Sequence, residues 1–334
     1  MKFFIQSCFV IFIMLFVGGC TQQVDVRFLQ PAEIDRVSNT KKITVAKFQN
    51  DTVGLSNKIE SQLSNHKIEG KNYFKVISRK DFDKIIAEQK LQNSGLVDLS
   101  NVVKVGELLE AQAMILGRVD DVGFSVGSFY EERRECVDKK CKELRKYTVE
   151  CFKQRVSLSA DIRIVDIQKG DIIYANTIPV SSTHKHCSDD SRVLPDKMAE
   201  ARYLSGRIAS RFVYKLMPHY RYVSVNMLED ADLDYTDKQE KLLEVALAYV
   251  EQKRYDKAQK FLIQLIDSTD QKSYVPFYNL GVLKEMDGDY ISAKRYYKKA
   301  DDLMVEPVEE INLALVRIDK LIQNNRVTKE QLSR

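Results

Sequence analysis

An internal repeat near the end of the chain places the strongest constraint on its fold. Residues 243–262 align with residues 278–297 at a constant spacing of 35 residues. The aligned pairs are Ala246 with Gly281, Tyr255 with Tyr290, Ala258 with Ala293, and Leu262 with Tyr297. A period of this length indicates helical hairpins that stack on one another to bury their apolar faces. We therefore expect an all-α module of two repeats and a closing helix over residues 237–325.

The second copy resembles the tetratricopeptide consensus at the positions where two helices pack closely: Phe277, Leu280, Gly281, Ala293, Tyr297 and Ala300. The first copy departs from it at Leu242 and Leu265, so generic helical hairpins remain the alternative. The resemblance implies a concave surface that takes a peptide or helix of an envelope protein. Asn279 and Lys284 are the candidate partner-binding residues on that surface.

The beginning of the chain has the pattern of an export signal. Residues 3–17 are largely apolar and follow Lys2, but they are too few for a membrane-spanning helix. The sequence that follows, Val17-Gly18-Gly19-Cys20, resembles the lipobox of a bacterial lipoprotein. The alternative is an ordinary cleaved signal with an incidental cysteine.

The lipoprotein resemblance implies a signal peptide over residues 1–19 and acyl chains, palmitate among them, on Cys20. Thr21 and Gln22 follow where an inner-membrane retention signal would place Asp, so the resemblance favours anchorage in outer-membrane lipid with the body in the periplasm. Residues 20–41 lack sustained periodicity and contain Pro31, which predicts a lipidated tether.

Export also decides how the cysteines are interpreted. Four cysteines remain once Cys8 leaves with the signal and Cys20 is assigned to lipid: Cys136, Cys141, Cys151 and Cys187. An oxidising compartment predicts two disulfides with three conceivable pairings, of which we favour one bridge within residues 136–151 and one reaching Cys187. A metal site built from His184, His186 and Cys187 is the alternative, although the spacing matches no compact zinc motif.

Residues 42–226 alternate strand and helix patterns. The strands are expected at residues 43–50, 74–78 and from Ala111 onward, and the helices at residues 55–66, at residues 79–91 and after Ser100. Residues 158–178 predict a hairpin with its turn at 168–171, and residues 196–216 predict a helix followed by an edge strand at 222–225. This order indicates an α+β domain in which helices pack on a mixed sheet.

This domain resembles the CsgG family of outer-membrane lipoproteins. The resemblance rests on the Glu88-Gln89 pair after a strand and helix, the ILGRV strand at residues 115–119, and the VDIQKGDI turn at residues 165–172. Members of the family include the curli export channel, holdfast-anchor proteins and periplasmic activators of penicillin-binding proteins. The resemblance therefore implies a fold and an envelope location, whereas the function depends on the individual surface.

A cysteine-bearing insertion over residues 125–153 interrupts the domain. Its charged runs supply little apolar surface, so we expect disulfides to order it. In the curli channel this region contributes membrane-spanning strands, but here the alternation begun by Val122, Phe124 and Val126 ends in the charged residues 131–135. A secretion-channel subunit that exports curli-like or adhesive fibre subunits is therefore the alternative function.

The sequence contains no recognisable catalytic motif, which predicts a non-enzymatic protein without a cofactor. Its 52 basic and 48 acidic residues are intermixed along the chain, so nothing indicates nucleic-acid binding. The prediction is an outer-membrane-anchored periplasmic lipoprotein that acts as a binding or assembly factor for a cell-envelope or surface-structure complex. The sequence leaves open whether this protein forms a homo-oligomer.

Overall fold

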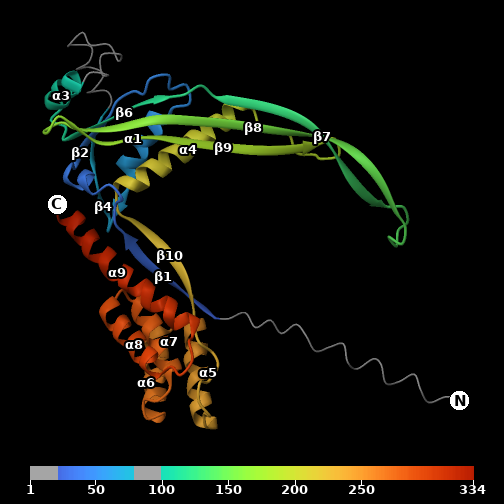
Figure 1. The fold of residues 1–334 in the computed structure, drawn as a ribbon, viewed down its shortest axis with the longest axis vertical. Helices are drawn as coiled ribbons and strands as arrows, with labels where there is room; N and C mark the ends of the chain where they lie inside the picture. Colours follow the sequence, from blue (N-terminus) through green and yellow to red (C-terminus); the bar gives the residue numbers. More distant parts are fainter. Residues whose placement is uncertain (1–21, 79–98) are drawn as a thin grey trace. The chain divides into compact units, whose positions relative to one another are not determined.

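The computed structural model describes residues 22–78 and 99–334 (Figure 1). The chain divides into two compact units. The sheet unit contains Gln30–His219 and Val327–Arg334, and the helical unit contains Tyr220–Arg326 together with the residues up to Leu29. Cys20, the predicted lipidation site, and the helix expected at residues 79–91 lie outside the described residues. Among those described, no helix has both the length and the apolar character needed to cross a membrane.

A mixed six-stranded sheet organises the sheet unit. Strand β2 (Lys42–Val45) pairs in parallel with β5 (Lys75–Ile77) and with β6 (Ala113–Val119). Strand β8 (Leu144–Asp166) is antiparallel to β6, to β7 (Gly123–Cys136) and to β9 (Asp171–Cys187). The α+β class expected from the sequence is confirmed.

The β8–β9 hairpin forms because its apolar residues alternate and its turn contains a glycine. Ile162, Ile164 and Ile178 are buried, whereas Gly170 at the turn adopts a φ of +65°. A positive φ strains most side chains but not glycine. The hairpin predicted around residues 168–171 is confirmed. The strand expected from Ala111 is interrupted, because β6 ends at Val119 and β7 begins at Gly123.

Helices cover this sheet. Helix α4 (Lys197–Leu216) packs on β8 and β9, and α1 (Leu55–Asn65) packs on α4 (Figure 1). The Asp196 side chain caps α4 by accepting hydrogen bonds from two backbone N–H groups in its first turn. In the part of this unit that the structure describes, the remaining elements are the 3-10 helix η1 (Asp35–Asn39), α3 (Leu99–Leu108) and a small hairpin of β3 (Lys67–Ile68) and β4 (Lys71–Asn72).

The cysteine-bearing insertion is a hairpin rather than an irregular loop. Strands β7 and β8 stay paired from Gly123 with Ser157 to Cys136 with Leu144, and residues 130–150 extend beyond the end of β9 (Figure 1). We call residues 130–150 the hairpin arm. The backbone ladder and the cross-strand ion pairs Arg145–Glu135 and Lys146–Glu132 supply the order that the sequence assigned to disulfides alone.

Two expectations about the ends of the predicted domain are wrong. Residues 23–30 are not a tether: they form β1 (Gln23–Gln30), in which Val24 and Val26 are buried. Strand β10 (His219–Asn226) pairs with β1 and is not an edge strand of the mixed sheet. Val24, Val26 and Val225 join the core of the helical unit, so apolar burial accounts for this two-stranded pair.

The helical unit contains two helical hairpins and a last helix, as predicted. The hairpins are α5 (Asp237–Glu251) with α6 (Tyr255–Ser268), and α7 (Tyr274–Met286) with α8 (Tyr290–Leu303). Helix α9 (Glu309–Ser333) follows and places Ile311, Ala314 and Ile318 in the same core. Residues 35 positions apart occupy equivalent buried positions, as Ala258 with Ala293 and Leu262 with Tyr297 show.

Candidate functional site

The four cysteines form two disulfides in the sheet unit. Cys136 pairs with Cys141 at the tip of the hairpin arm, and Cys151 pairs with Cys187 across β8 and β9 where the arm begins. Two disulfides, one of them reaching Cys187, agree with the expectation from the sequence, which did not choose the partner of Cys187. Cys151 and Cys187 are buried beside Val149, with Phe129 and Tyr147 packed against them, so the second disulfide lies in a small apolar cluster of its own.

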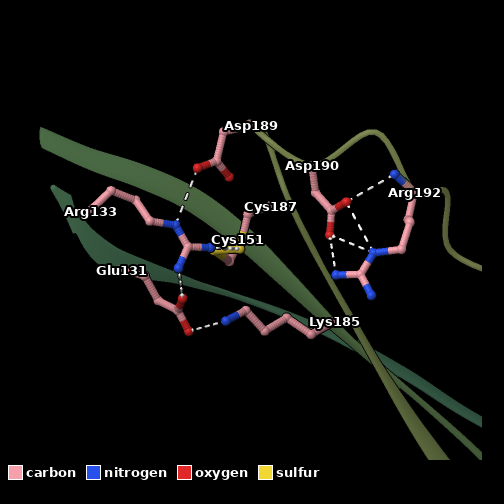
Figure 2. A network of polar contacts seen from close by, with 8 residues as sticks. All are labelled: Glu131, Arg133, Cys151, Lys185, Cys187, Asp189, Asp190 and Arg192. Carbon is pink, nitrogen blue, oxygen red and sulfur yellow. Dashed lines mark hydrogen bonds and ion pairs between the residues drawn. A yellow bond between two sulfur atoms is a disulfide. The ribbon is translucent and has the colours of Figure 1, made fainter. Parts of the chain in front are cut away.

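A network of charged side chains surrounds the Cys151–Cys187 disulfide (Figure 2). The Arg133 guanidinium lies between two carboxylates: Nη1 is 3.0 Å from Glu131 and Nε is 3.2 Å from Asp189. Its Nη2 lies 3.4 Å from the Cys187 sulfur. Lys185 donates a hydrogen bond to Glu131. That bond, together with the nearby positive charges, lowers the pKa of the Glu131 carboxyl below its usual value.

This network joins β7, β9 and the turn that follows β9. In that turn Arg192 holds Asp190 through several hydrogen bonds, and they lower the pKa of Asp190 to about 2 (Figure 2). Ion pairs this exposed contribute little stability individually. The disulfide supplies a covalent link between β8 and β9, and the Arg133 and Lys185 contacts connect β7, β9 and the following turn at the base of the hairpin arm.

The structure does not assemble the metal site considered from the sequence. His184 and His186 share one face of β9, whereas the next residue, Cys187, points to the other face and is bonded to Cys151. His184 Nε2 instead lies 3.2 Å from the buried Glu200 carboxylate of α4. Among the described residues, Glu131, Cys151 and Cys187 do lie close enough to share a cation, but the disulfide removes both thiolate ligands.

The group around Glu200 does not have the geometry of a nucleophilic triad. Burial alone would raise the pKa of Glu200, but the nearby Ser182 hydroxyl and His184 ring lower it below its usual value. A histidine that activates a serine must lie between the hydroxyl and the carboxylate. Here the Glu200 carboxylate is the group that neighbours both Ser182 and His184, and the His184–Glu200 contact joins α4 to β9.

The two residues predicted to bind a partner both make hydrogen bonds within the helical unit. Asn279 is fully buried, and its amide side chain exchanges two hydrogen bonds of 2.8 Å with the backbone of Leu228. Lys284 is half-buried and donates a hydrogen bond of 2.8 Å to Gln259. The prediction for Asn279 is wrong, because α7 is buried on nearly every side and a partner cannot reach this amide.

An open groove lies instead on α8, beside the start of α7. It encloses about 520 Å³ and has an apolar floor formed by Phe277, Ile291 and Tyr296. The Ile291 side chain is 70% exposed, and the Phe277 and Tyr296 rings lie 6.5 Å apart between centroids. We call this the α8 groove.

The rim of the α8 groove is basic. Four cations line it against one acid: Lys294, Arg295, Lys298 and Lys299 against Asp302. Lys294 is paired with Asp319 at 2.5 Å, whereas Lys298 and Lys299 are exposed. The cluster of basic residues is visible in the sequence as KRYYKK at residues 294–299. Only the packing of α7 against α8 shows that these charges border an apolar floor.

Comparison with known proteins identifies part of the chain. Residues 32–191 match the family described as curli production assembly/transport component CsgG. No curated protein matches the sequence. Similar solved structures include the C-terminal domain of LpoB from Salmonella enterica, with 12% identity, a TM-score of 0.26, and coverage of 45% of this chain and 95% of that chain. Lipoprotein GNA1162 from Neisseria meningitidis has 15% identity and a TM-score of 0.28, and covers 52% of this chain and 96% of its own.

The family match covers the mixed sheet from η1 through the β8–β9 hairpin and ends just before α4. The matched residues therefore lie largely within the α+β domain whose sequence resembled this family. This part of the chain, residues 32–191, is therefore similar to the CsgG family.

Proposed function

We propose that the protein is an outer-membrane-anchored periplasmic lipoprotein that acts as a non-enzymatic binding or assembly factor for a cell-envelope or surface-structure complex. The similarity to the CsgG family supports an envelope role. The lipobox at Cys20 supports the anchor. Two disulfides suit an oxidising compartment outside the cytoplasm.

The observation that carries the binding role is the α8 groove. A partner that binds here would bury the exposed apolar floor away from water and would pair its own negative charges with the basic rim. The fitting ligand is an acidic segment of an envelope protein with an aliphatic or aromatic side chain that covers Ile291. The repeat module thus remains the proposed recognition element, but the contact surface moves from Asn279 to α8.

A photocrosslinking amino acid at Ile291 tests this role in living cells. We expect crosslinks to a protein of the envelope fraction, identified by mass spectrometry. The double variant Lys298→Glu/Lys299→Glu should abolish them, since it reverses the charge of the rim. The matched control Lys238→Glu/Lys260→Glu changes two exposed lysines of α5 and α6 outside the groove and should leave them intact. If the rim variant and the control variant crosslink to the same extent, the α8 groove is not the binding surface.

The anchor is tested in the same strain by fractionation. Cys20→Ser removes the acceptor thiol, so the protein should move from the outer-membrane fraction to the soluble periplasm. An unchanged distribution would rule out a lipid anchor at this position, whatever the crosslinking result.

A further inference from the structure

A second surface in the sheet unit carries clustered positive charge. A cavity of about 560 Å³ lies between α4 and the β8 and β9 strands. Three arginines line it, Arg155 from β8 and Arg207 and Arg211 from α4, against one acid, Asp121. The Asp121 carboxylate accepts a hydrogen bond of 3.0 Å from Asn50. The lining therefore has an excess of positive charge and suits an anion.

The two α4 arginines are held in place by the edge of the sheet. Arg207 donates a hydrogen bond of 3.3 Å to the Ser181 carbonyl, and Arg211 donates one of 3.1 Å to the Pro179 carbonyl. These carbonyls are two residues apart on β9, so both belong to the same strand edge. One carbonyl occupies only part of a guanidinium's donor capacity, so each arginine keeps further N–H groups with which it can bind a ligand.

An aromatic cavity adjoins the first. This open hollow of about 490 Å³ is lined by α4 and by Gln62 of α1, and it shares Arg207 and Arg211 with the first cavity. Tyr203 and Tyr214 border it and are 63% and 53% exposed. These tyrosines and arginines follow one face of the helix at helical spacing. Exposed tyrosine beside arginine is the composition found at the energetic centres of protein interfaces.

We propose that this face of α4, together with Arg155, binds an acidic peptide segment of a partner protein. Carboxylates of the segment pair with the three arginines, and apolar side chains on either side of these carboxylates pack against Tyr203 and Tyr214, which lie about 16 Å apart along the helix. Gln62 and Ser210 also line the aromatic cavity. This mixed polar lining suits a peptide better than an acyl chain, which requires a continuous apolar channel. The surface is separate from the α8 groove, so the two proposals can fail independently.

Fluorescence anisotropy on the purified full chain tests the proposal. The probe is a fluorescein-labelled peptide in which phenylalanines flank glutamates, and its glutamine analogue is the reference. All proteins carry Lys298→Glu/Lys299→Glu, so that the α8 groove does not contribute. Arg155→Gln should weaken probe binding about tenfold, because it removes a charged hydrogen-bond donor. Arg163→Gln, an exposed arginine of the same strand outside the cavity, should change it by less than about twofold.

Further measurements separate charge from packing and from lipid. Tyr203→Ala should lower the affinity for the probe peptide, but that affinity should still decrease with salt concentration, because the arginines remain. Thermal melting of each variant verifies that it is folded. Equal affinity of Arg155→Gln and Arg163→Gln, or equal binding of the glutamine analogue, would overturn the proposal. It would also be overturned if phosphatidylglycerol vesicles bound in an Arg155-dependent way and the peptide did not, since the surface would then recognise lipid.

Discussion

At the scale of single residues, Lys41 has an unusual environment. Its ammonium group lies 3.6 Å from the centroid of the Tyr73 ring and donates a hydrogen bond of 3.1 Å to the Gln331 carbonyl. Burial, and then the nearby Arg334 charge, lower the pKa of Lys41 from 10.5 to about 8. The unfolded chain therefore takes up this proton at higher pH than the folded chain. Lys41 contributes stability above pH 10.5, and that contribution is lost as pH falls to about 8.

We predict that an NMR titration of the Lys41 Cε resonance has its midpoint near pH 8. Arg334→Gln should raise the midpoint, because it removes a repelling charge. A blocked lysine peptide in the same buffer supplies the reference profile. A Lys41 midpoint that coincides with that of the peptide would contradict the described environment.

At the scale of elements, two helical glycines have opposite surroundings. A Cβ at Gly281 in α7 would lie 2.6 Å from the Tyr297 ring of α8, so this glycine allows the two helices to approach closely. The Tyr297 hydroxyl is also fixed, since it donates a hydrogen bond of 2.5 Å to the buried Glu285 carboxylate. A Cβ at Gly206 in α4 would meet nothing within 4 Å. The same substitution should therefore have opposite effects at the two positions.

Gly281→Ala should lower the free energy of unfolding of the helical unit by about 1–3 kcal/mol, because the new methyl group overpacks the α7–α8 contact. Gly206→Ala should raise that of the sheet unit by about 0.5–1 kcal/mol, since alanine favours a helix over glycine. Guanidinium unfolding of both variants measures the difference. If both variants lost a similar amount of unfolding free energy, α7 and α8 would not pack as described.

At the scale of the whole molecule, the last residues of the chain belong to the sheet unit. Val327–Arg334 group with Gln30–His219, and Gln331 is fully buried. The Gln331 side chain accepts a hydrogen bond of 2.8 Å from the Ala32 N–H and donates one of 3.2 Å to the Ala32 carbonyl. Residues that lie far apart in sequence thus complete one core. For this reason point variants test the repeat module better than deletion of residues 237–334.

Gln331→Leu should destabilise the sheet unit by about 2 kcal/mol or more, because both backbone groups of Ala32 lose their partner in a buried environment. Hydrogen exchange of residues 30–219, followed by mass spectrometry, measures the loss as faster exchange. Gln323→Leu changes an exposed glutamine of the same helix and should leave exchange unchanged. Indistinguishable exchange in the two variants would show that the end of α9 does not stabilise this unit.

The sequence by itself determined the features that depend on neighbouring residues. The repeat register, the Gly170 turn and the start of α4 at Asp196 follow from periodicity, positive φ and capping, which are local properties. The number of cysteines and the oxidising compartment were enough to predict that four of them form two disulfides. The basic run on α8 was also visible, but a charged run alone does not differ from a solvated helix face.

Only the tertiary structure decided the features that join distant segments. No local pattern pairs β1 with β10, because that pairing depends on the core that both strands share with the helices. Asn279 looked available to a partner until packing placed its amide against Leu228. Arg155 and Arg207 lie on different elements and share a cavity only because α4 folds back over β8 and β9. Such contacts depend on chain topology, which residue spacing does not encode.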